Sequence, residues 1–167
     1  YGTEQMTSKP IVVGMGPAGM FCALLLAENG YCPIIIDRGD NVTDRTLALD
    51  RFVKTGVLDT DSNVQFGAGG AGTFSDGKLT TRINDSRCSY VLSRFVDFGA
   101  PKEILTKAKP HIGTDVLTKV VDNILARIEE LGGEVVRLGF LIELGDLKGR
   151  EKLSKYEFVS VMKFDGE

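Results

Sequence analysis

Three glycines near the N-terminus have the spacing of a phosphate-binding turn. Gly14, Gly16 and Gly19 follow the apolar run PIVV and spell GxGxxG. In such a turn the first glycine allows the tight bend, the second admits a pyrophosphate against the backbone, and the third lets a helix approach a strand closely. The N-terminus of the following helix would favour the negative charge of the phosphates. The pattern therefore predicts a site for a nucleotide diphosphate.

An acidic residue follows this turn at about the separation that the dinucleotide fingerprint requires. Asp37 ends the next apolar run, PIII, and its carboxylate would accept hydrogen bonds from the adenosine ribose hydroxyls. Its charge would also repel a 2′-phosphate, which disfavours NADP. Pro17 and Ala18 open the predicted helix, and we count them with the phosphate-binding residues.

A second glycine-rich stretch, QFGAGGAGTFSDGKLTTR, covers residues 65–82. Glycine gives up side-chain contacts here, so the exposed peptide groups should have a compensating use. Successive N–H groups can point into one concavity and bind an anion. The residues that would form this concavity are Gly69, Gly70, Ala71 and Gly72.

The same stretch contains a near-match to a P-loop, GxxxxGK, from Gly72 to Lys78. A P-loop needs Ser or Thr next, to hold magnesium, and this chain has Leu79. An NTPase is therefore disfavoured. For Ser75, Asp76 and Lys78, a solvated loop tip and a ligand contact remain equally open.

The remaining reactive side chains do not form a catalytic or metal-binding set. His111 is the single histidine, and its loop setting favours a structural hydrogen bond. Cys22, Cys32 and Cys88 lie far apart and show no metal-ligand spacing, so we expect reduced, buried thiols in a cytoplasmic protein.

The elements that would position these residues follow a strand–helix–strand order. Buried strands are predicted at 10–14 and 33–39, with a helix from Pro17 that Gly30 ends. This order implies a parallel sheet with flanking helices, a Rossmann-like α/β fold. Further helices are predicted at Thr43–Lys54, with Leu49, Phe52 and Val53 inward, at Arg87–Phe98, at Lys102–Ala108, and at Thr114–Leu131 with Thr114 as cap. Glu134–Leu138 reads as a third strand, and strands at Leu141–Leu144 and Tyr156–Phe164 as a C-terminal β-meander.

The bulk composition fits one domain over residues 1–167. A net charge of -3 and the lack of a basic stripe disfavour a nucleic-acid partner. No apolar run is long enough to span a membrane, and the N-terminus lacks the pattern of a secretion signal.

Residues 10–136 resemble the N-terminal region of bacterial FAD-dependent dehydrogenases within the glutathione-reductase-like superfamily. NVQFGAGGAGTFSDGKLTTR and the downstream AKPHIGTD carry the resemblance. Two positions depart from the family pattern, since Ala68 and Asp37 each stand where glutamate is commoner.

The resemblance implies FAD as cofactor and hydride transfer between FAD and an unidentified small molecule. Gly14, Gly16, Gly19 and Asp37 would bind the ADP half, with Arg38 beside it. The pyrophosphate and flavin side would be lined by Gly69, Gly70, Ala71, Gly72 and Thr73. The chain would then be a fragment of a larger two-domain flavoprotein. Two alternatives remain open: an NAD-binding dehydrogenase domain, and a cofactor-binding module without turnover of its own.

Overall fold

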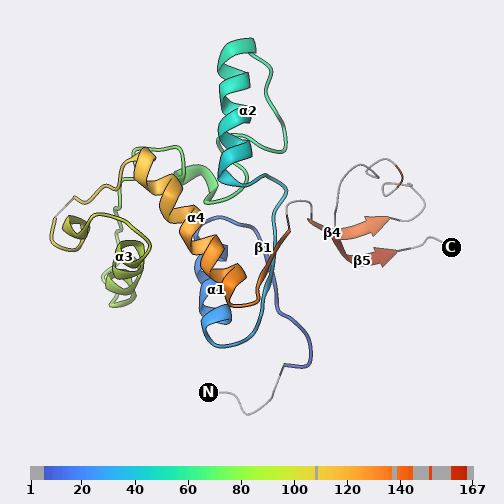
Figure 1. Ribbon diagram of the computed structural model, residues 1–167, viewed down its shortest axis with the longest axis horizontal. Coiled ribbons are helices and arrows are strands. Elements are labelled where there is room, and N and C mark those ends of the chain that lie inside the picture. Colours follow the sequence, from blue (N-terminus) through green and yellow to red (C-terminus); the bar gives the residue numbers. More distant parts are fainter. Residues whose placement is uncertain (1–5, 108, 137–138, 145–150, 152–158, 165–167) are drawn as a thin grey trace.

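The centre of the fold is a three-stranded parallel sheet. A computed structural model describes residues 6–107, 109–136, 139–144, 151 and 159–164. Its strands are β1 (Ile11–Val13), β2 (Ile34–Ile36) and β3 (Glu134–Val136), in the order β1-β2-β3. Val12 pairs with Ile35, which in turn pairs with Val135. The predicted parallel α/β sheet is confirmed (Figure 1).

Two helices, α1 (Pro17–Glu28) and α4 (Thr114–Glu130), pack against each other and form most of the core (Figure 1). In α4, apolar residues recur at the helical period and lie inward, as the sequence predicts. The buried ones are Leu117, Val120, Val121, Ile124, Leu125 and Ile128. Thr114 is the first helical residue rather than the cap, and its hydroxyl donates to the Ser75 carbonyl at 2.5 Å.

The two faces of the sheet differ. Val12 and Ile35 are buried in the core that α1 and α4 build. Ile11 and Val13 point to the opposite face and are 44% and 64% exposed, because side chains alternate along a strand. The expectation that β1 is buried on both faces is therefore wrong.

Helix α3 (Arg87–Asp97) and the 3-10 turn η2 (Lys102–Leu105) pack beside this core. The Phe21 and Phe95 rings of α1 and α3 meet edge to face, with centroids 5.4 Å apart. An ion pair between Glu28 and Arg94 joins the same two helices. The long connection between β2 and β3 thus adds a flanking layer.

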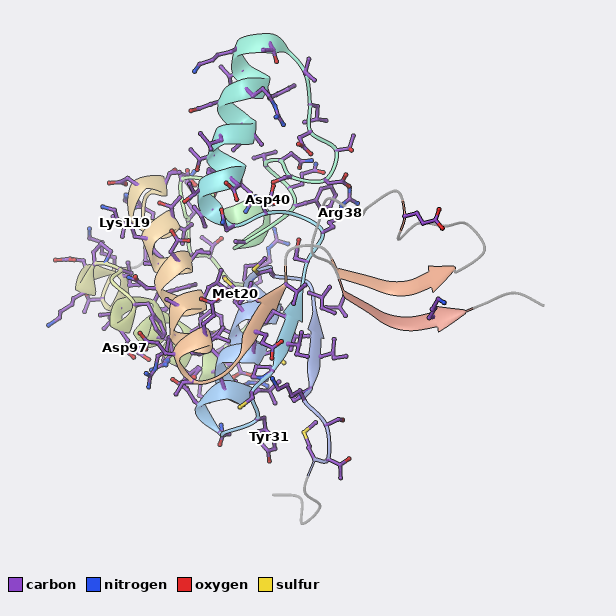
Figure 2. The ribbon with its side chains drawn as sticks, turned by 45° about the vertical axis from the view of Figure 1, so that its right-hand side comes forward. Met20, Tyr31, Arg38, Asp40, Asp97 and Lys119 are labelled. Carbon is purple, nitrogen blue, oxygen red and sulfur yellow. The ribbon has the colours of Figure 1, made fainter. Side chains whose placement is uncertain are left out.

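Helix α2 (Val42–Thr55) extends away from the sheet (Figure 1). The predicted inner face is wrong for Phe52 and Val53, which are 40% and 82% exposed, whereas Leu49 is half-buried. Val42, Arg45 and Ala48 are buried instead, because α2 packs only through its first two turns. Figure 2 shows Arg38 and Asp40 near the base of this helix and Tyr31 toward the other end of the sheet.

The C-terminal strands β4 (Gly139–Leu144) and β5 (Val159–Phe164) form a separate two-stranded sheet. They pair in parallel, so the predicted β-meander, which requires antiparallel neighbours, is wrong. The parts of the predicted strands at 137–138 and 156–158 lie outside the described residues.

Two smaller findings concern the exposure of the thiols and the length of the helices. Cys22 is exposed and Cys32 and Cys88 are half-buried, so the expected burial of the thiols is wrong. Within the described part of the chain, no helix is both long and apolar enough to cross a membrane.

Gly19 is a position where a single added methyl group should strongly destabilise the fold. A Cβ there would lie 1.8 Å from the Gly14 carbonyl oxygen. We expect Gly19→Ala to lower the free energy of unfolding by about 3 kcal/mol, because helix and turn must separate. Gly72→Ala is the matched control, since a Cβ at Gly72 meets no atom within 4 Å. Equal denaturation midpoints for the two variants would contradict the steric argument.

Candidate functional site

The predicted phosphate turn lies where β1 passes into α1. Gly14 has a φ of 101°, which favours glycine, and its N–H donates to the Ile36 carbonyl at 2.7 Å. Gly16 is the N-cap of α1, and Pro17 is the first residue of the helix. No atom lies within 4 Å of the place that a Cβ at Gly16 would occupy. The turn therefore presents open backbone at the N-terminus of a 12-residue helix.

Asp37 lies at the end of β2, close to this turn, and its carboxylate is bound to the backbone. One oxygen accepts from the Met15 N–H at 2.6 Å and the other from the Gly39 N–H at 2.8 Å. A carboxylate oxygen has room for a second donor, so a ribose hydroxyl contact is compatible with these bonds. The Asp37 side chain is part of the turn as well as a candidate ligand contact.

The glycine-rich segment folds back onto the turn. The Gly69 N–H donates to the Met15 carbonyl at 2.9 Å. A Cβ on Gly70 would lie 3.3 Å from both the Gly16 Cα and the Pro17 Cδ. The two glycine-rich stretches, far apart in sequence, are thus in direct backbone contact through η1 (Gly70–Gly72).

The other predicted ligand residues differ in their accessibility. Ala18, Ala71 and Gly72 are exposed, whereas Thr73 is buried and its hydroxyl donates to the Ala68 carbonyl at 3.0 Å. Arg38 stacks on the Phe66 ring, 4.0 Å from its centroid, and pairs with the Asp61 carboxylate at 3.3 Å. The guanidinium of Arg38 is therefore committed to the segment at 60–66.

Arg45, which the sequence analysis missed, is fully buried beneath the glycine-rich segment. Its guanidinium donates to the carbonyls of Asn63, Val64, Ala68 and Gly70, at 3.0–3.1 Å except for the shorter bond to Ala68. Burial lowers the pKa of Arg45 to about 10, and the charge of Asp37 opposes this shift. Arg45 is thus still cationic at neutral pH. Its i, i+3 spacing from Val42 and Ala48 was the signal that could have revealed its burial.

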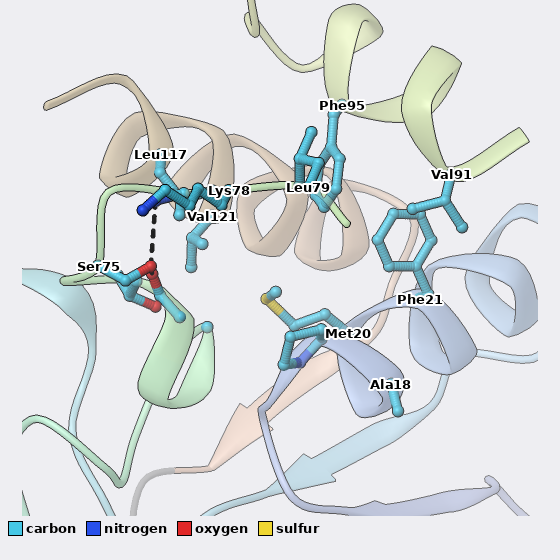
Figure 3. A pocket seen from close by; sticks show the side chains of 15 residues that line it. Ala18, Met20, Phe21, Ser75, Lys78, Leu79, Val91, Phe95, Leu117 and Val121 are labelled. Atoms are coloured by element: carbon cyan, nitrogen blue, oxygen red, sulfur yellow. Dashed lines mark hydrogen bonds between the residues drawn. The ribbon is translucent and has the colours of Figure 1, made fainter. Parts of the chain in front are cut away.

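A cavity of about 450 Å³ opens beside the turn, between α1, α3, α4 and the glycine-rich segment (Figure 3). Most of its walls are apolar, including Met20, Phe21, Phe95 and Leu117. Ser75 and Lys78 lie at one side of it. Such walls suit an uncharged group better than a phosphate.

The near-match to a P-loop does not have the structure of one. Lys78 pairs with His111 in an isolated antiparallel bridge, and no helix begins in the described stretch 73–86, after η1 (Gly70–Gly72) and before Arg87. The Leu79 N–H donates to the Pro110 carbonyl at 2.9 Å, and the Ile112 N–H donates to the Gly77 carbonyl at 3.1 Å. His111 thus lies in a short stretch of backbone pairing, and Lys78 is paired with Asp76 at 2.8 Å.

No protein-family model matches the chain. The chain is 57% identical over 134 residues to an uncharacterized protein of Clostridium beijerinckii, covering 80% of this chain and 25% of that protein. It is 56% identical over 43 residues to an adenine phosphoribosyltransferase of Clostridium tetani. This match covers 26% of this chain and 25% of that protein. It is 51% identical over 89 residues to an adenine phosphoribosyltransferase of Clostridium novyi. This match covers 47% of this chain and 51% of that protein. The chain therefore spans between a quarter and a half of these relatives.

These names contradict the resemblance to FAD-dependent dehydrogenases. The relatives from Clostridium tetani and Clostridium novyi are named adenine phosphoribosyltransferases, which are transferases and not flavin enzymes. The prediction of a flavin-dependent oxidoreductase that uses FAD for hydride transfer is therefore wrong. The alternative of an NAD-dependent dehydrogenase is wrong for the same reason. The resemblance rested on glycine-rich backbone, and such backbone binds phosphate groups in many classes of protein.

The carboxylate of Asp37 should contribute to stability through its two backbone bonds. In Asp37→Asn one oxygen remains, and the new NH2 group faces a backbone N–H. We expect a loss of about 1–3 kcal/mol in the free energy of unfolding, because a part-buried donor is left unpaired. Asp50→Asn, at an exposed position of α2, should change it by less than about 0.5 kcal/mol. Similar losses in both variants, measured by urea denaturation, would contradict this role.

Proposed function

We propose that this chain binds an adenine nucleotide, with a phosphate against the backbone at Gly16. The observation that carries the proposal is the open space at Gly16, at the N-terminus of α1. Free N–H groups and the helix dipole both favour an anion at this place. The nearby Gly70 backbone supplies a second wall at the same turn.

The names of the relatives support the choice of adenine. An adenine phosphoribosyltransferase is named for joining adenine to a phosphoribosyl group, which together make an adenine nucleotide. Asp37, at the end of β2, is the proposed acceptor for a ribose hydroxyl. We propose residues 10–136 as the nucleotide-binding unit, with Gly14, Gly16, Pro17, Ala18 and Gly19 at the phosphate and Gly69, Gly70, Ala71, Gly72 and Thr73 beside it.

Phosphoribosyl transfer is the second candidate function, and the names of the relatives favour it. In that reaction a C–N bond forms between adenine and the ribose, and the bond from the ribose to a diphosphate breaks. Magnesium commonly supports such steps by neutralising the phosphate charge. Among the residues that the structure describes, no group of three or more His, Cys, Asp or Glu side chains could hold a metal ion. We derive no step through a magnesium ion.

Binding of ADP and adenosine by variants of the turn tests the proposed function. We expect the protein to bind ADP more tightly than adenosine, because only ADP carries phosphates to the turn. Gly16→Val should weaken ADP binding about tenfold or more, since its side chain fills the open space, and a factor of ten is about 1.4 kcal/mol. Cys22→Val, at an exposed position of α1, should leave the affinity unchanged.

Isothermal titration calorimetry gives the measurement, and circular dichroism shows that each variant is folded. ADP binding that survives Gly16→Val would place the phosphates elsewhere. Incubation with adenine and 5-phosphoribosyl diphosphate separates the two candidates. AMP formation supports the transferase, whereas ADP binding without AMP formation supports a nucleotide-binding role alone.

A further inference from the structure

Arg45 is a buried cation whose hydrogen bonds all go to main-chain carbonyls of one segment. It is fully buried, and its acceptors are the carbonyls of Asn63, Val64, Ala68 and Gly70. The Phe74 ring lies 4.8 Å from the guanidinium carbon. In the described part of the chain, no carboxylate forms an ion pair with it at 4.0 Å or less. The negative charge of Asp37 acts on it from beyond that distance.

These bonds fix the direction of the peptide groups in the glycine-rich segment. In a trans peptide the carbonyl and the following N–H point in opposite directions. The Ala68 carbonyl faces Arg45, so the Gly69 N–H faces away and reaches the Met15 carbonyl at 2.9 Å. The Gly70 carbonyl also faces Arg45, at 3.1 Å, so the Ala71 N–H must face away from the guanidinium.

The same contacts connect Arg45 to the phosphate turn. Arg45 donates a hydrogen bond to the Gly70 carbonyl. Gly70 in turn lies against the turn, because a Cβ on Gly70 would lie 3.3 Å from the Gly16 Cα and from the Pro17 Cδ. A guanidinium is suited to this arrangement because it has five donors in one plane. Lysine would keep the charge, but its single ammonium cannot reach four carbonyls in that geometry.

We propose that Arg45 is the positioning residue of the anion site. It turns the Ala68 and Gly70 carbonyls inward and leaves the Ala71 N–H to face the ligand, beside a buried positive charge. This inference deepens the proposed function and rests on it for the nucleotide. It requires only that the site bind a diphosphate group.

The test compares Arg45→Lys and Arg45→Met with a control on the same helix. The probes are inorganic diphosphate, ADP and adenosine, each titrated by calorimetry. We expect both variants to lose about tenfold or more in affinity for diphosphate and ADP, while the adenosine affinity changes by less than about twofold. Arg51→Lys should change none of the three, because Arg51 is exposed on α2 and bonds Asp59 at 2.8 Å.

Each outcome decides between the alternatives. Retained diphosphate affinity in Arg45→Lys overturns the positioning role, and equal losses for diphosphate and adenosine assign Arg45 to the fold as a whole. Binding of diphosphate without binding of ADP refutes the proposed function and leaves this inference intact. If the unsubstituted protein does not bind diphosphate, the inference fails.

A measurement on the unsubstituted protein covers the case in which the variants do not fold. Diphosphate should slow hydrogen exchange at the Ala71 amide, because this N–H group would then face the ligand. The Gly69, Gly70 and Thr73 amides already donate to backbone carbonyls and serve as internal references. Unchanged exchange at saturating diphosphate would overturn the inference.

Discussion

Backbone packs directly against backbone at the centre of this protein, and the rest of the site depends on that close approach. A Cβ on Gly19 would lie 1.8 Å from the Gly14 carbonyl oxygen, and one on Gly39 would lie 2.5 Å from the Gly67 nitrogen. Side chains at these positions would push apart the helix, the turn and the glycine-rich segment. The glycines therefore set the distances between the helix, the turn and the glycine-rich segment. At Gly16 this arrangement leaves open space beside the backbone.

Two charged side chains near the turn, Asp37 and Arg45, both bind the main chain. Asp37 accepts from two N–H groups, and Arg45 donates to four carbonyls. Loops with few side-chain contacts must satisfy their peptide groups in some other way, because an unpaired buried peptide group is costly. In this site the Asp37 carboxylate is the hydrogen-bond partner for N–H groups of the turn, and the Arg45 guanidinium is the partner for carbonyls of the glycine-rich segment.

Much of the fold was predictable from the sequence, because the relevant signals are local. The period of apolar residues in α4 and the strand–turn–helix order around Gly14 depend only on neighbours in the chain. The orientation of α2 was not predictable, since its inner face depends on which turns meet the segment at 63–70. Parallel pairing of β4 and β5 is likewise a long-range choice.

The candidate site divides in the same way. The positions of Gly14, Gly16 and Gly19 follow from spacing, whereas the burial of Arg45 and the backbone bonds of Asp37 depend on how distant segments meet. The chemistry was the least predictable part. Glycine-rich phosphate-binding backbone is shared by many classes of enzyme, and the names of the relatives corrected the choice among them.

The shape of α2 also has a practical use in protein engineering. Its first two turns hold Arg45 in place, but its far end carries Val53 at 82% exposure and ends at Gly56, with φ 72°. Val57 and Leu58 follow at 63% and 54% exposure, before the chain returns toward Asn63. Exposed ends of this kind tolerate added sequence well. An affinity tag or a fluorophore-bearing peptide inserted after Gly56 would therefore be carried at the far end of α2, at a distance from the phosphate turn.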